Sequence, residues 1–96
     1  MYYLEKSCPV CQEGILGLLT CSDGEKVVIM CDECDSVWLS PEEVAIQEPI
    51  YPTPPDFFLP NSKISVSGGH SGWAQRDAIR EAGMENYISE ERKYTP

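Results

Sequence analysis

Two Cys-x-x-Cys motifs dominate the N-terminal part of this sequence. The first is Cys8-Pro9-Val10-Cys11, and nineteen residues separate it from the second, Cys31-Asp32-Glu33-Cys34. Each motif forms a tight turn that directs two sulfur atoms to one point, and this spacing is typical of structural zinc sites. The sequence therefore predicts one structural Zn²⁺ ion, with iron less favoured, bound by Cys8, Cys11, Cys31 and Cys34.

The redox state of the cysteines follows from the expected location of the protein. No apolar run is long enough to cross a bilayer, and the N-terminus MYYLEKS lacks the sections of a signal peptide. A cytoplasmic location is expected, where thiols stay reduced and paired cysteines bind metals more often than they form disulfides. A chain of 96 residues buries a modest core, so a metal would be a useful supplement to packing.

The residues around the cysteines favour β-structure. Two β-prone runs, 15–20 and 26–30, flank Ser22-Asp23-Gly24-Glu25, which has the composition of a hairpin turn. This hairpin would bring the second cysteine motif opposite the first, and a short strand is expected at 37–39. Ser40-Pro41-Glu42-Glu43 then indicates the start of a short helix, with Ser40 as N-cap and Glu43 in a capping box.

The rest of the chain divides into a connector and a C-terminal unit. Residues 48–62 carry five of the eight prolines together with large apolar side chains, so an extended, packed connector anchored by Phe57 or Phe58 is expected. Residues 63–67 alternate like a half-buried strand, and a helix is predicted from about 71 to 82. Gly83 would end that helix in a Schellman motif with Met84, and its buried stripe would be Ala74, Ala78, Ile79 and Ala82.

The predicted fold class is thus small α+β, in three sections of one compact unit. These are a β-hairpin with two cysteine knuckles and a short helix (1–47), a proline-rich packed connector (48–62), and a strand-helix extension (63–96).

The motif CPVC, a hairpin and then CDECDSVWLSPEEV resemble the TFIIB-type zinc ribbon family in its small bacterial form. That family has the pattern CPxCG, a hairpin and CxxCGGxWLDxxEL, and the resemblance covers about residues 7–45. The four paired cysteines fall on its ligand positions, whereas Gln12, Asp35 and Ser36 replace its glycines, so less regular knuckles are expected. The resemblance implies a ribbon fold with structural zinc, but ribbons serve many functions.

Other uses of the paired cysteines remain open. A redox dithiol would need a thioredoxin-like βαβ frame, which the sequence does not indicate. A rubredoxin-like iron centre for electron transfer is a further alternative. No enzyme activity is expected, because no nucleophile arrangement, open metal site or phosphate loop is recognisable.

The charge of the chain points to its partner. The formal net charge is −9, and residues 1–48 hold ten carboxylates against Lys6 and Lys26. Such a surface repels nucleic acid phosphates, and it is either a solvated face or a docking surface that attracts a basic protein. The leading hypothesis is a non-enzymatic protein-binding module, such as an immunity or antitoxin-type inhibitor of a basic toxin, for example a nuclease. Aromatic side chains that would hold the partner are Tyr51, Phe57 and Trp73.

The alternative hypothesis is a transcription- or RNA-associated zinc ribbon. It requires a basic face, for which the candidates are Lys63, Arg76, Arg80, Arg92 and Lys93. Membrane contact is not expected, and the oligomeric state is left open.

Single residues outside these motifs are expected to be structural. Cys21 is predicted to be a buried or half-buried free thiol rather than a substitute ligand or reactive thiol, and His70 to lie in a glycine-rich loop rather than at an anion site beside a helix. Trp38 is expected beneath the hairpin and Trp73 over the start of the last helix.

Overall fold

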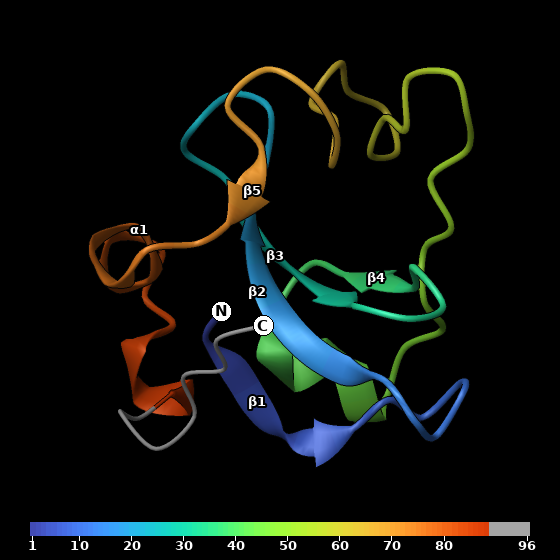
Figure 1. Ribbon diagram of the computed structural model, residues 1–96, viewed down its shortest axis with the longest axis vertical. Coiled ribbons are helices and arrows are strands. Elements are labelled where there is room, and N and C mark those ends of the chain that lie inside the picture. Colours follow the sequence, from blue (N-terminus) through green and yellow to red (C-terminus); the bar gives the residue numbers. More distant parts are fainter. Residues whose placement is uncertain (89–96) are drawn as a thin grey trace.

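A computed structural model describes residues 1–88 and consists of a small antiparallel sheet with a few short helices (Figure 1). The strands are β1 (Tyr3–Ser7), β2 (Ile15–Thr20), β3 (Val27–Cys31), β4 (Val37–Trp38) and β5 (Gly72–Trp73). The helices are the 3₁₀ turn η1 (Pro41–Ala45), the α-helix α1 (Arg76–Glu81) and the 3₁₀ turn η2 (Glu85–Tyr87). No helix among residues 1–88 is long and apolar enough to span a membrane.

Strand β2 is the centre of the sheet. One of its edges pairs along its length with β3, in a register that places Leu16 opposite Cys31 and Thr20 opposite Val27. Its other edge is shared, because β1 pairs with the first part and β5 with the last part, where Leu19 lies opposite Trp73. Residues from both ends of the described chain therefore meet on one strand (Figure 1).

The predicted hairpin is confirmed as β2 and β3. Its turn is closed by Asp23, whose Oδ1 accepts hydrogen bonds from the backbone N–H groups of Glu25 and Lys26, each at 3.0 Å. These two bonds hold the pKa of Asp23 below its usual value. Gly24 adopts a φ of 74°, which a turn of this kind requires and glycine accepts without strain.

The sheet is buried on both faces. Successive side chains of a strand point to opposite faces. Leu16, Leu18 and Ile29 accordingly join one core with Trp38 and Ile79, which α1 and η1 help to cover. The second core forms on the other face from Leu19, Cys21, Val28, Val37, Leu59 and Val66.

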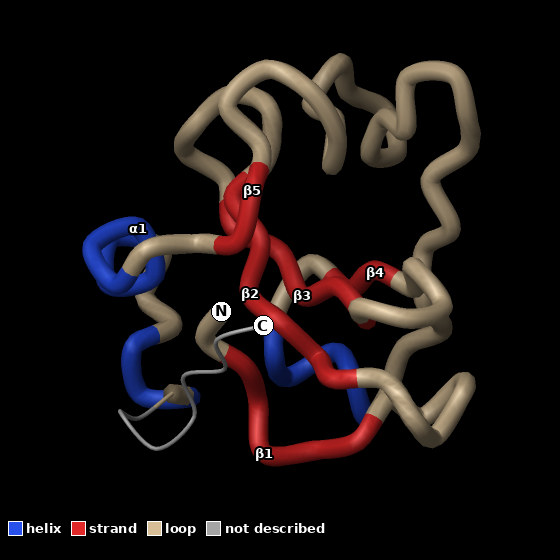
Figure 2. Tube along the Cα trace, viewed as in Figure 1, coloured by secondary structure: helices blue, strands red, loops and turns tan. Residues whose placement is uncertain are grey.

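The connector covers that second face without regular structure (Figure 2). Ile50 exchanges two backbone hydrogen bonds with Val37, of 2.7 and 2.9 Å, so the connector continues the sheet beyond β4. The connector packs against the sheet, but the expected anchor, Phe57 or Phe58, is wrong. Its buried anchor is Leu59, whereas Phe57 is half-buried and Phe58 is exposed.

Leu59 is therefore expected to matter more to stability than its aromatic neighbour. Its side chain is 3% exposed, and Leu59→Ala should lower the free energy of unfolding by about 2–5 kcal/mol through lost burial and a cavity. Denaturant unfolding of the purified protein measures this change. Phe58→Ala, at a side chain 43% exposed, is the control and should cost clearly less. Equal losses in the two variants would contradict this account of the second core.

The strand predicted at 63–67 is wrong. Ser65 forms an isolated bridge with Phe58, and serine hydroxyls replace the ladder of a regular strand. The Ser65 N–H donates to Ser22 Oγ at 2.8 Å, the Ser65 hydroxyl donates to the Asp56 carbonyl, and the Ser67 N–H donates to Ser65 Oγ at 2.9 Å. Serine side chains that bond nearby backbone compete with secondary structure in this way.

The helix predicted from 71 to 82 is also too long. Gly72 and Trp73 pair with β2 instead, and α1 covers Arg76–Glu81. The predicted Schellman end is confirmed: Met84 N–H donates to Ile79 O and Gly83 N–H to Arg80 O, both at 3.0 Å, and Gly83 has a φ of 76°. In the predicted stripe, Ala74 and Ile79 are buried, Ala78 is half-buried and Ala82 is exposed.

The short helix predicted after Ser40 is present as η1, but its capping box is absent. Ser40 is the N-cap residue without a side-chain capping bond, and the turn is closed by the Glu43 N–H donating to the Ser40 carbonyl at 3.2 Å. In a 3₁₀ turn the side chain of the third residue points in a different direction from that in an α-helix. The Glu43 side chain therefore does not reach back to the backbone N–H of Ser40.

Candidate metal centre

The four paired cysteines lie together at one end of the central hairpin. One sulfur atom from each of Cys8, Cys11, Cys31 and Cys34 lies within 4.8 Å of all the others. The Cys8 and Cys34 sulfurs are 3.6 Å apart, and those of Cys11 and Cys31 are 3.7 Å apart. Both of these close approaches join one motif to the other.

These separations fit a tetrahedral metal ion. A Zn–S bond of about 2.3 Å implies an S···S edge of about 3.8 Å in a regular tetrahedron. A disulfide would need about 2.05 Å. All five cysteines are free thiols, so the four sulfurs have the spacing of ligands around one ion rather than of bonded pairs.

The hairpin positions the two motifs. The first lies between β1 and β2, and the second begins at Cys31, the last residue of β3, so both are at the same end of the β2–β3 pair. Beyond the last ladder pair, Asp32 N–H donates to Ile15 O at 3.0 Å and Ile15 N–H donates to Asp32 Oδ1 at 2.7 Å. The Asp32 side chain therefore ties the second motif to the start of β2.

Backbone N–H groups surround the sulfurs. Val10 N–H donates to Cys8 Sγ at 3.4 Å and Gly14 N–H to Cys11 Sγ at 3.3 Å. In the second motif, the N–H groups of Glu33 and Cys34 both donate to Cys31 Sγ at 3.5 Å. Donors of this kind favour the thiolate form of cysteine, which is the form that binds metal.

The second motif holds two thiols of unlike acidity. Burial raises the pKa of Cys31 to about 12. Burial would also raise the pKa of Cys34, but hydrogen bonds from the Ser36 hydroxyl and N–H, together with those involving Cys31 and Cys8, lower it to about 7. The Ser36 Oγ lies 3.1 Å from Cys34 Sγ and is fully buried.

The knuckles keep the backbone shape of a glycine-containing turn without the glycines. Gln12 has a φ of 62° and Asp35 a φ of 60°, both in the left-handed region. These are two of the positions at which the resembled ribbon pattern has glycine. At these two positions the knuckles therefore follow the backbone path that glycine would take. The irregularity is that Gln12 and Asp35 hold a backbone conformation that glycine adopts more easily.

Gln12→Gly should accordingly stabilise the protein. Gln12 is exposed, so the substitution removes little packing. It relieves the strain of a left-handed backbone, about 1 kcal/mol. The net gain in stability is this strain energy minus the entropic cost of ordering a glycine, which is more flexible in the unfolded chain. Thermal unfolding of the metal-loaded protein measures the gain. Gln12→Ala is the control, since alanine keeps the strain; a glycine variant no more stable than the alanine variant would contradict the explanation.

Gly14 is a further residue of the centre that sequence reasoning missed. A Cβ atom built on it would lie well inside van der Waals contact of Cys31 Sγ, 3.2 Å from Asp32 Oδ1 and 3.3 Å from Glu33 Cβ. The backbone of the first motif thus passes directly over a sulfur of the second. In the sequence, the signal for this close approach was a glycine three residues after Cys11.

The remaining singled-out residues lie outside the sulfur cluster. Cys21 is buried in the second core, where desolvation followed by the nearby Asp23 raises its pKa to about 11, as suits the predicted inert thiol. His70 is exposed in a loop and precedes α1 by six positions, so it does not stand at a helix start. Trp38 is buried, as predicted, and its Nε1 donates to Gln47 O at 3.2 Å. Trp73 packs over Gly17 of β2 and lines a pocket together with Ala78 of α1.

Comparison with known proteins adds a relative but no function. The chain is 29% identical over 89 residues to a protein named "Uncharacterized protein L48" from Acanthamoeba polyphaga mimivirus, covering 84% of this chain and 72% of that one. No family model matches the chain. No solved structure matches it either.

Proposed function

We propose that this protein is a non-catalytic zinc ribbon that binds a basic protein partner. The observation that carries the first half is the cluster of four sulfurs with tetrahedral spacing. Cys8, Cys11, Cys31 and Cys34 would complete the shell of one zinc ion, and a four-thiolate shell leaves no position for a substrate. The metal would then stabilise the fold and hold the surface around it.

The charge around the cluster supports the second half of the proposal. Glu13, Glu33 and Asp35 are exposed at the two knuckles and form no ion pair with another residue in 1–88. Four thiolates and one divalent ion would make this end still more negative. An acidic surface on a rigid support attracts a basic partner and speeds association.

The nucleic acid alternative receives less support from the candidate basic face. Arg80 pairs with Glu85 at 3.1 Å and with Asp77 at 3.7 Å, and Arg76 pairs with Glu85 at 3.3 Å. Lys63 is exposed, and Arg92 and Lys93 lie outside the described residues. Both arginines of α1 thus form ion pairs with acidic side chains. Retention of RNA or DNA on filters at physiological salt would reverse this ordering.

The proposal has two separate tests. Elemental analysis of protein purified under reducing conditions should give one zinc per chain. A partner isolated from the native cell should be basic, and its affinity should fall as salt rises. The double variant Glu13→Gln/Glu33→Gln should weaken that binding, whereas Asp77→Asn/Glu81→Gln, with the same change of charge on α1, should not. A partner that is acidic, or bound without salt dependence, would overturn the proposed surface.

The narrower hypothesis of an immunity or antitoxin-type inhibitor stays a prediction. It requires that the basic partner is a toxin and that binding abolishes its activity. An inhibition assay against a candidate nuclease toxin checks it directly.

A further inference from the structure

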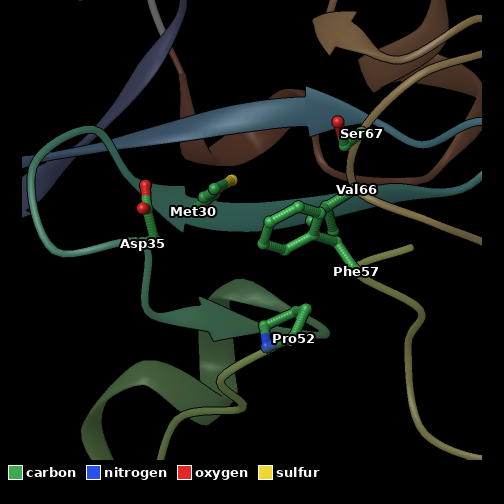
Figure 3. Close-up of a pocket in the computed structure, with 6 residues that line it drawn as sticks. All are labelled: Met30, Asp35, Pro52, Phe57, Val66 and Ser67. Carbon is green, nitrogen blue, oxygen red and sulfur yellow. The ribbon is translucent and has the colours of Figure 1, made fainter. Parts of the chain in front are cut away.

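A small apolar cavity opens beside the candidate metal centre, between the second face of the sheet and the connector (Figure 3). Its volume is about 250 Å³, and it is lined by Met30, Asp35, Pro52, Phe57, Val66 and Ser67. Pockets for cofactors and drug-sized ligands occupy roughly 300–1,000 Å³. This cavity therefore has the size of a site for a single side chain.

Asp35 supplies the one charged group of the lining. It is exposed, and within residues 1–88 its carboxylate forms no ion pair or hydrogen bond. Asp35 directly follows Cys34, so a bound metal would also fix the position of its backbone. Figure 3 shows Asp35 and Met30 on one side of the pocket and Phe57 with Val66 on the other.

Phe57 reaches the pocket through an unusual backbone. Its φ is 55°, a left-handed value that a bulky side chain rarely adopts. Two hydrogen bonds fix it there, from Phe57 N–H to Thr53 O at 2.9 Å and from Val66 N–H to Phe57 O at 3.1 Å. Strained residues of this kind cluster at ligand sites, where the surrounding structure maintains them.

We propose that this pocket receives an arginine side chain of the partner protein, an inference that rests on the proposed binding function. The apolar stem of arginine would lie against Met30, Pro52 and Val66, while its guanidinium meets the Asp35 carboxylate and stacks on the Phe57 ring. A lysine fits less well, because its ammonium is strongly hydrated and cannot stack as a plane. Arginine is also enriched among the residues that dominate interface energies.

The test uses N-acetyl-L-arginine N-methylamide as a probe and the metal-loaded, ¹⁵N-labelled full chain. Titration followed by NMR should give saturable amide shifts centred on Asp35, Phe57 and Val66. Asp35→Asn should weaken the probe's affinity about tenfold, because a hydrogen-bonded charge pair is lost. Asparagine accepts the left-handed φ of this position, so the knuckle should stay folded. Glu81→Gln, the same charge change on α1 and outside both the pocket and the acidic knuckles, should leave the affinity unchanged.

Two further probes and one variant separate the contributions. The citrulline analogue keeps the shape of arginine without its charge and should bind about tenfold more weakly. Phe57→Leu keeps an apolar side chain but removes the ring, and should also weaken the arginine probe. Equal binding of the corresponding lysine derivative would overturn the assignment to a guanidinium.

The outcome for the pocket is distinct from the outcome for the proposed function. Absence of saturable shifts at these amides, or equal affinity in wild type and Asp35→Asn, would overturn the pocket inference without involving the natural partner. The salt dependence of the whole complex and the metal content judge the proposed function separately.

Discussion

Removing the metal should unfold the protein. Structural zinc in small modules contributes on the order of 10 kcal/mol to folding, comparable to the whole stability of a domain. Both knuckles and the start of β2 adjoin the sulfur cluster, and β2 pairs with three other strands, β1, β3 and β5. Incubation with a strong chelator and a reductant should therefore abolish the near-ultraviolet circular dichroism of the buried Trp38, with the metal released in parallel.

Two controls give this experiment its meaning. Stoichiometric zinc added back should restore the signal, which distinguishes metal loss from irreversible aggregation. Cys21→Ala removes a thiol that lies outside the cluster, so this variant should keep a full complement of metal, whereas Cys31→Ala should not. A chain that stays folded after its metal has been removed, or that purifies folded and metal-free, would contradict the proposed structural role.

A single methyl group added at Gly14 should weaken the binding of the metal. The added Cβ would overlap Cys31 Sγ, and Asp32 and Glu33 leave little room for the backbone to withdraw. The Gly14 N–H also donates to Cys11 Sγ, so any displacement costs a hydrogen bond to a ligand as well. We expect Gly14→Ala to lower the affinity for zinc by about 10- to 100-fold, the scale seen when groups that orient ligands are lost.

Competition with a chromophoric chelator measures that affinity, and the chain offers a matched control. A Cβ atom added to Gly72 would meet no heavy atom within 4 Å, and the φ of Gly72 lies outside the left-handed range. Gly72→Ala should therefore bind zinc like the wild type. Normal zinc affinity in Gly14→Ala would show that the two knuckles are less closely packed than the structure indicates.

Local signals in the sequence identified the hairpin and the four cysteines, because both are determined by nearby residues. The β-prone runs and the Asp23-Gly24 turn need no distant partner, and a Cys-x-x-Cys turn has the same shape in many settings. The Schellman end at Gly83 was predictable for the same reason. The predicted metal ligands lie together, although the identity of the metal stays a prediction.

The elements that were missed depend on contacts far along the chain. Strand β1 carries charged Glu5 and Lys6 after Leu4 and was not recognised, yet its pairing with β2 gives it a place in the sheet. Gly72 and Trp73 were predicted to be helical, but they pair with the last part of β2, on the edge whose first part pairs with β1. Ser65 was predicted to lie in a strand, but its N–H donates to the hydroxyl of Ser22, 43 positions away. Tertiary contacts overrode local preference in each case.

The division of β2 between two partners has a consequence for synthesis on the ribosome. All four sulfur donors lie within residues 8–34, so a metal could be captured before residues 72 and 73 have been translated. The last part of β2 must wait for Gly72 and Trp73. A nascent chain would therefore carry an unpaired stretch of edge at Leu19 and Thr20 during that interval, at the end of β2 away from the sulfur cluster and open to pairing with another chain.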